Sequence, residues 1–401
     1  MLSEKLRSEF LAVQQLVRLV VPDNAETGPA LLIKANSLAL KYLVRRKQFT
    51  FLVTRLEDSD FVLYAVKIDD DPNFPAVFWS LAQEENELKA LHMVTERGRC
   101  DVFLFNEGAI NVCSASILLT ASAGSARVLA PVALPGNSDL ERVRSEVGRF
   151  LDISHRQHYA NMHKFVPSSD CKWQTIRNFY ITNQLQRSMI DLVNGDEGDQ
   201  QETLAVWLTD ALSITGAIQR PEVHEVSGPR ELTDVLFSYV GGCFLVESKT
   251  LSVLDRSELP DRMKLKKNVL KNISKALSQL PGACRNIKRG LKITDQRGEE
   301  VTVERSLPTH CVILVPDLSL LDENDGLGGN FTKAFLKENA AYLHFLDPDA
   351  LLRSVQHAYM LLRNSKAGMP LIAGLDAALM IRWQKAAEHT TPNVDLLMRV
   401  E

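Results

Sequence analysis

The clearest pattern of apolar and polar positions lies in residues 231–249. Two apolar runs, at 235–237 and 243–246, flank the pair Gly241-Gly242. A glycine pair between two such runs is typical of a tight β-hairpin turn. Continuous apolar runs of this length are typical of strands inside a buried sheet. We therefore predict a buried antiparallel hairpin here, around which the C-terminal half of the chain is organised.

Charged residues stand at the outer ends of both predicted strands. Asp234 opens the first strand, and Glu247 and Lys249 close the second. In an antiparallel hairpin the start of one strand lies beside the end of the other, and side chains two residues apart point to the same face. Because burying charges is costly unless they are paired or bind a metal ion, we predict that these three side chains form one cluster.

Two carboxylates and one ammonium group suit the metal-assisted hydrolysis of phosphodiesters. Mg²⁺ prefers oxygen ligands, takes one or two protein carboxylates and keeps several waters. A bound metal activates water and stabilises the attacking and leaving oxygens, and a lysine neutralises charge in the transition state. The alternative for the same residues is a structural salt bridge between Lys249 and one of the acids.

The spacing of these residues resembles the motif of the PD-(D/E)xK nuclease superfamily. Asp234 is followed after twelve residues by Glu247 and, two positions later, by Lys249. Thr233 stands where the family usually has proline. The resemblance covers about 200–320 and implies a restriction-endonuclease-like αβββαβ core with a mixed sheet. It also implies that Asp234 and Glu247 bind Mg²⁺ or Mn²⁺ and that Lys249 orients the attacking water.

The same resemblance assigns two supporting residues. Nucleases of this superfamily place a glutamate on the helix before the first core strand, and Glu202 lies in the predicted helix 200–214. They also place a Lys or Gln on the helix after the E-x-K strand, where Gln279 lies. Glu225 and Glu231 are rival metal ligands, and an acid in the first turn of a helix also interacts favourably with the helix dipole.

A strongly basic segment follows the hairpin. Residues 262–292 contain ten Lys or Arg and no Asp or Glu, so with a net charge of −4 for the whole chain the remainder carries −14. This asymmetry indicates a polyanionic partner, and apolar residues at helical spacing from Leu265 to Leu280 predict one buried helix face. The alternative is a solvated basic face or one that binds an acidic protein. We assign nucleic-acid contacts to Lys264, Lys266, Lys267, Lys271, Lys275, Arg285, Lys288 and Arg289.

Residues 1–150 are predicted to form an α+β domain with mostly antiparallel strands. The pattern favours helices at 2–20, 31–42 and 84–94. It favours strands at 49–56, 61–68, 76–81, 101–106 and 109–113. Because this region carries no convincing catalytic set, we expect a recognition, assembly or regulatory module, with a regulatory protein as a candidate partner.

Residues 151–199 are predicted to form a helical linker region that includes a long helix at 173–192. Residues 200–401 are predicted to form the nuclease-like domain. Its expected elements are a helix at 200–214, strands at 221–227, 232–240 and 243–250, a helix at 264–281 and a strand near 311–316. That order agrees with the αβββαβ core that the resemblance implies.

Length and composition add three expectations. A chain of 401 residues exceeds one typical domain. With 45% hydrophobic and 24% charged residues it has an ordinary soluble composition, and no apolar run approaches the length of a membrane span. Six scattered cysteines without a C-x-x-C pair are typical of free thiols, so we expect a cytoplasmic protein without disulfides and without a membrane partner.

Together these patterns predict a magnesium-dependent nuclease that acts on DNA. A nuclease joined to an unrelated N-terminal domain resembles bacterial anti-phage defence effectors, which implies control by the N-terminal half. Two alternatives stay open: a scaffold that binds nucleic acid without cutting it, and a module that only binds protein. A homo-oligomer is also compatible with the resemblance, because superfamily members often dimerise to cut both strands.

Overall fold

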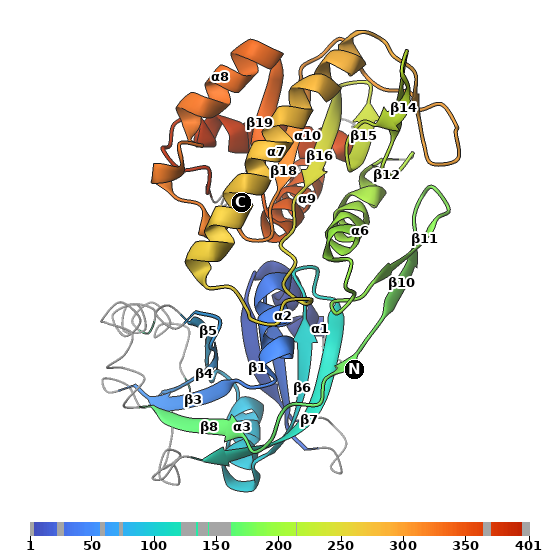
Figure 1. Ribbon diagram of the computed structural model, residues 1–401. Coiled ribbons are helices and arrows are strands. Elements are labelled where there is room, and N and C mark those ends of the chain that lie inside the picture. Colours follow the sequence, from blue (N-terminus) through green and yellow to red (C-terminus); the bar gives the residue numbers. More distant parts are fainter. Residues whose placement is uncertain are drawn as a thin grey trace. The chain divides into compact units, whose positions relative to one another are not determined.

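The computed structural model describes residues 4–21, 28–56, 61–71, 75–121, 134, 143, 162–213, 215–363 and 370–394. The chain divides into two compact units, Met1–Ile176 (unit 1) and Arg177–Glu401 (unit 2). Both units combine helices with β-sheets (Figure 1). The expected mixed α/β class is therefore confirmed.

Unit 1 is built on one large sheet. Its elements are α1 (Glu4–Ala12), β1 (Leu16–Val20), β2 (Ala30–Lys34), α2 (Ser37–Arg46), β3 (Thr50–Arg55), β4 (Val62–Ile68), β5 (Ala76–Leu81), α3 (Glu85–Arg97), β6 (Arg99–Phe105), β7 (Asn111–Ala121), β8 (His163–Pro167) and β9 (Gln174–Thr175). In the described residues the sheet has nine strands in the order β1-β2-β6-β7-β8-β3-β4-β5, with β9 paired to β7. The β2–β6 pair is parallel, and the neighbouring β1–β2 and β6–β7 pairs are antiparallel.

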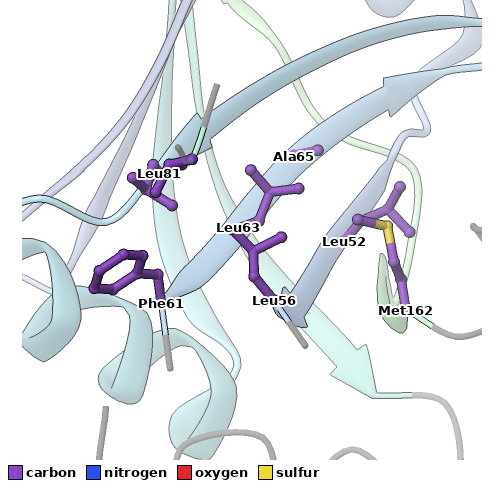
Figure 2. Packing of buried hydrophobic residues seen from close by; sticks show 8 residues of the cluster. Leu52, Leu56, Phe61, Leu63, Ala65, Leu81 and Met162 are labelled. Atoms are coloured by element: carbon purple, nitrogen blue, oxygen red, sulfur yellow. The ribbon is translucent and has the colours of Figure 1, made fainter. Parts of the chain in front are cut away.

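Apolar side chains from β3, β4 and β5 form a compact core cluster (Figure 2). Within it Leu52 on β3 lies opposite Ala65 on β4, and Leu63 on β4 lies opposite Leu81 on β5, so these side chains meet on one face of the sheet. The buried residues labelled in the figure are Leu52, Leu56, Phe61, Leu63, Ala65, Leu81 and Met162. This cluster gives unit 1 a hydrophobic core of its own.

Two helix predictions in unit 1 are wrong in part. The predicted helix 2–20 ends as α1 at Ala12, and residues 16–20 form strand β1. The predicted helix 31–42 likewise begins as strand β2, and α2 starts only at Ser37. Runs of Leu and Val satisfy both the helical and the strand period, and the pairing of β1 with β2 decides for strands here. The predicted strands 49–56, 61–68 and 76–81 are confirmed as β3, β4 and β5.

Unit 2 contains a central mixed sheet flanked by helices (Figure 1). Its main elements are α6 (Glu197–Thr209), β12 (Ile218–Gln219), β15 (Val235–Tyr239), β16 (Gly242–Ser248), α7 (Arg262–Lys288), β18 (Thr309–Leu314), α8 (Gly329–Asn339), β19 (Ala341–Leu346), α9 (Pro348–Arg363) and α10 (Leu371–Ala386). The order of the five strands within the described residues is β12-β15-β16-β18-β19. β15 runs antiparallel to both of its neighbours, β12 and β16, and β18 and β19 continue parallel to β16.

Helices cover both faces of this sheet. The thiols of Cys284 on α7 and Cys311 on β18 are 3.4 Å apart. His310, the residue that precedes Cys311 on β18, instead contacts Asp376 on α10. Because successive strand residues point to opposite faces, α7 and α10 lie on opposite sides of the sheet. The strands β16 and β18 between them are accordingly buried along their whole length and mostly apolar.

A second, smaller sheet changes the predicted strand order. It consists of β13 (Glu222–Glu225), β14 (Gly228–Glu231) and β17 (Ile293–Thr294), in the order β14-β13-β17. The predicted strand 221–227 therefore exists as β13 but does not join the central sheet, whose first strand is β12. The chain turns between the two at Arg220, which has a φ of 47°.

The predicted helix 173–192 is wrong, and the prediction that the linker region 151–199 is helical is wrong in its described part as well. Within the described part of 151–199, strands β10 (Asn178–Ile181) and β11 (Arg187–Ile190) form an antiparallel hairpin, and 151–161 lies outside the described residues. Phe179 and Ile181 are exposed while Tyr180 between them is half-buried. This alternation is the strand period, and the aromatic and β-branched residues favour it.

Candidate active site

The predicted hairpin is confirmed and carries the charged residues at one end. In the β15–β16 pair, Val235 lies opposite Val246. Asp234 and Glu247 are the next residues beyond this pair, so both carboxylates lie at the same end of the sheet. Both residues are buried, although carboxylates seldom are. The sheet therefore brings two acids into a site that shields them from water.

Lys249 supplies the positive charge between the two acids. Its ammonium nitrogen lies 2.7 Å from Glu247 Oε2 and 3.3 Å from Asp234 Oδ2. The Lys249 side chain is 13% exposed and that of Glu247 is 4% exposed. The three residues predicted from the sequence thus form one closely packed ionic cluster.

Backbone hydrogen bonds fix the geometry of this cluster. The N–H of Ser248 donates to Asp234 Oδ2 at 2.5 Å, and the N–H of Lys249 donates to the carbonyl of Leu314 on β18 at 2.8 Å. Thr233 donates its hydroxyl to the carbonyl of Val246 at 2.8 Å. The Thr233 side chain therefore adds a bond across the hairpin next to Asp234.

Glu202 extends the acidic cluster from α6. Its Oε2 accepts hydrogen bonds from Arg220 Nε at 2.9 Å and from Gln219 Nε2 at 3.3 Å. Arg220 also pairs with Asp199 one turn earlier on α6. The backbone N–H of Arg220 donates to the carbonyl of Asp234 at 2.7 Å, so Arg220 ties α6 to the start of β15.

The acids influence one another strongly. Burial, followed by the charge of Asp234, raises the pKa of Glu202 to about 7. The same two causes, in the same order, raise the pKa of Glu247 and of Glu231. Burial acts to lower the pKa of Lys249, but the adjacent carboxylates outweigh it and the pKa is raised. The surroundings therefore favour the charged form of the lysine and disfavour the charged forms of Glu202, Glu231 and Glu247.

This excess of negative charge suits a divalent cation. Asp234 and Glu247 both direct an oxygen at the Lys249 nitrogen, so a cation bound by this pair would lie beside the lysine and share the carboxylates with it. One or two carboxylates completed by water are a normal ligand set for Mg²⁺, and the pair fits it. Among the residues that the structure describes, no three Cys, His, Asp or Glu side chains are gathered closely enough to enclose a metal ion.

The two rival ligands have different surroundings. Glu231 feels the charge of Asp234 and is electrostatically part of the cluster. Glu225 instead accepts from Arg230 at 2.7 Å and from Asn286 at 2.8 Å on the side of α7. Glu231 thus remains a candidate ligand, whereas Glu225 is engaged elsewhere.

The basic helix forms with one face buried, as predicted. Leu265, Val269 and Ile273 are buried along α7, and Asp261 caps its N-terminus by accepting from the N–H of Lys264. The predicted contact residues on the opposite face are exposed, with one exception. Lys266 is half-buried and pairs with Asp322 and Asp325. The exposed ones are Lys264, Lys267, Lys271, Lys275, Arg285, Lys288 and Arg289.

Gln279 is exposed on α7 and makes no hydrogen bond to the ionic cluster within the described residues. Asn272, about two turns earlier, donates to the carbonyl of Thr250 at 2.8 Å and ties α7 to the segment just after β16. Sequence reasoning missed both Asn272 and Arg220. No local pattern distinguishes either, because each is brought to the site by a contact between distant segments.

No protein-family model, curated protein or solved structure matches this chain. Among the described residues, no helix is both long and apolar enough to cross a membrane. The chemistry of the cluster itself is therefore the basis for assigning a function.

Proposed function

We propose that unit 2 is a metal-dependent nuclease of the PD-(D/E)xK type that hydrolyses phosphodiester bonds, with DNA as the expected substrate. The observation that carries the proposal is the convergence of Asp234, Glu247 and Lys249 at one end of a buried hairpin. An acid–acid–lysine set of this kind combines ligands for a divalent cation with a fixed positive charge.

The order of elements supports the same proposal. Helix α6 is followed by the antiparallel strands β12, β15 and β16, then by α7 and the parallel strand β18. This is an αβββαβ succession on a mixed sheet, which the resemblance to the superfamily leads us to expect. The small sheet β14-β13-β17 is then an addition to that core.

Each residue of the cluster would have a distinct role in hydrolysis. Asp234 and Glu247 would hold Mg²⁺ or Mn²⁺, and Glu202 would reach the same ion from α6 through one of the waters that Mg²⁺ keeps. When bound, the ion supplies an activated water and charge stabilisation for the leaving oxygen. Lys249 would orient that water through its ammonium group and stabilise negative charge on the phosphate. Arg220 positions Glu202 through the 2.9 Å bond.

The exposed face of α7 supports a polyanionic substrate. Its lysines recur at positions 267, 271 and 275, one helical turn apart, and none of the three forms an ion pair within the described residues. Such groups contact phosphates without reading sequence. The helix therefore offers affinity for nucleic acid next to the candidate active site.

A cleavage assay tests the proposal. Supercoiled plasmid, linear duplex DNA and single-stranded RNA would each be incubated with Mg²⁺ or Mn²⁺ and with wild-type protein, Lys249→Ala or Glu247→Gln. We expect metal-dependent cleavage by the wild type and its loss in both variants. Lys333→Ala, which changes an exposed lysine on α8, is the matched control and should cut normally.

The alternatives predict different results. Cleavage that survives in both active-site variants would refute the assigned residues. Salt-dependent binding without cleavage in any divalent metal would favour a nucleic-acid-binding scaffold. Absence of binding even at low salt would favour a module that contacts only proteins.

A further inference from the structure

The C-terminal half of α7 packs against the small sheet through a polar contact. Glu225 on β13 accepts from Arg230 Nε on β14 at 2.7 Å and from Asn286 Nδ2 on α7 at 2.8 Å. One carboxylate thus holds the arginine and the helix together. Arg230, which lies far from Asn286 in sequence, is fixed beside that helix.

Gly282 lies where two arginines approach α7. A Cβ atom built on Gly282 would lie 3.9 Å from Arg285 Nη2 and 4.0 Å from Arg230 Nη2. These are ordinary contact distances, and the backbone there is not in the left-handed region. Neither packing nor backbone conformation therefore requires glycine, although glycine weakens a helix interior. A bare backbone does allow a ligand to approach closely.

The surroundings of Gly282 are positively charged. Arg285 and Arg289 are exposed and form no ion pair with any described residue. Glu225 is the acid that faces them, and its bond to Arg230 is the largest cause of its lowered pKa. Three guanidinium groups against one carboxylate leave a positive excess. Guanidinium groups bind phosphate oxygens through short, charge-assisted hydrogen bonds.

We propose that Arg230, Arg285 and the bare backbone at Gly282 form an arginine notch that holds one phosphodiester group of the nucleic-acid substrate. The proposal rests on the proposed nuclease function and assigns a place to the substrate backbone. It adds Arg230 and Gly282, which lie outside the lysine stripe, to the contact surface. A phosphate in the notch would accept from both guanidinium groups while resting on the helix.

The position of the notch relates it to the candidate active site. Asn272 contacts Thr250, immediately after Lys249. Gly282 lies ten residues further along α7, a rise of about 15 Å. That distance corresponds to roughly four base-pair steps of a duplex. The notch would therefore hold the backbone a few nucleotides from the scissile bond, at the far end of the stripe formed by Lys267, Lys271 and Lys275.

Binding of a fluorescein-labelled DNA duplex tests the notch without requiring cleavage. The full-length protein would be titrated in EDTA at several salt concentrations. We expect Gly282→Ala to keep or raise the melting temperature, because alanine favours helix, yet to weaken binding about tenfold. Arg230→Ala and Arg285→Ala should each weaken binding by a similar factor, and less than additively when combined. Ser278→Ala, an exposed substitution one turn earlier on α7, is the control for helix propensity.

The outcomes separate this proposal from the nuclease assignment. If Gly282→Ala and Arg230→Ala bind the duplex as tightly as wild type, the notch is refuted, whether or not the protein cuts DNA. If inorganic phosphate binds the wild type but these substitutions leave the affinity for the duplex unchanged, the notch binds a free anion and not the nucleic-acid backbone. The notch proposal is then also overturned. Weakened binding in Gly282→Ala with cleavage still dependent on Lys249 supports both proposals. If binding is weakened in Gly282→Ala but neither the wild type nor any variant cleaves DNA, the notch is supported and the nuclease assignment is refuted.

Discussion

The ammonium nitrogen of Lys249 lies 2.7 Å from Oε2 of Glu247 in a buried setting. Asp234 shares the same nitrogen at 3.3 Å. This arrangement places the positive charge where it compensates two acids at once. Any second cation at these carboxylates must share them with the lysine, so stability and metal binding would be linked at this cluster.

Lys249→Ala should therefore destabilise the metal-free protein. Removing one partner of a buried ion pair leaves uncompensated charge and costs about 3–5 kcal/mol. Because a divalent cation can replace the lost positive charge, Ca²⁺ or Mg²⁺ should raise the melting temperature of the variant more than that of wild type. Thermal unfolding in EDTA and in each metal measures both effects, with Lys333→Ala as control. Equal responses of the two proteins to metal would contradict a cation site at Asp234 and Glu247.

Glu202→Gln should change how stability depends on pH. Folding raises the pKa of Glu202 from 4.5 to about 7, so its ionisation favours the unfolded chain. The stability it contributes is complete below its ordinary pKa and is lost as the pH rises through about 7. Wild type should thus lose about 1–3 kcal/mol relative to the glutamine variant between pH 4.5 and 8.

Urea unfolding of both proteins across this pH range measures the difference. Glu338→Gln, at an exposed position of α8, should show no such trend. Added Mg²⁺ should reverse the advantage of the glutamine variant at pH 8 if Glu202 binds the ion. A pH-independent difference would mean that Glu202 is ionised as readily in the folded protein as in the unfolded chain.

The lysines of α7 should differ in their effect on nucleic-acid binding. Replacing Lys267, Lys271 and Lys275 together by alanine should lower affinity and reduce the salt dependence by about two to three counterions. Lys266→Ala, on the same helix, should have a smaller effect because that ammonium is engaged by Asp322 and Asp325. Affinity plotted against salt on logarithmic axes gives both quantities. An equal or larger effect of Lys266→Ala would show that the described ion pairs open on binding.

Tyr239→Phe should destabilise unit 2 without touching the ionic cluster. The Tyr239 hydroxyl donates to Asp376 at 2.5 Å, and Asp376 in turn contacts His310. Loss of a hydrogen bond to a charged group costs about 1.5–3 kcal/mol. Tyr359→Phe, at a residue that is 51% exposed, is the matched control and should cost little. Denaturant unfolding compares the two, and equal stabilities would show that the bond to Asp376 contributes nothing net.

Sequence reasoning was reliable where the pattern was long or closed by a short turn. The 27-residue helix α7 keeps one apolar face over its length, so its period is unambiguous. The hairpin of β15 and β16 has its register set by a tight turn. Short runs were less reliable: residues 16–20 and 178–190 satisfy either period, and only pairing with another segment decides for strands.

The sequence by itself determined that Asp234, Glu247 and Lys249 lie close together. Hairpin pairing and the two-residue strand period, which bring them together, act over only a few positions. Tertiary structure alone decided that Arg220 holds Glu202, that β12 rather than β13 opens the central sheet, and that Arg230 meets Gly282. Each of these depends on a contact between segments far apart in the chain. Such contacts are set by the packing of whole elements, which the local periodicity of the sequence does not reveal.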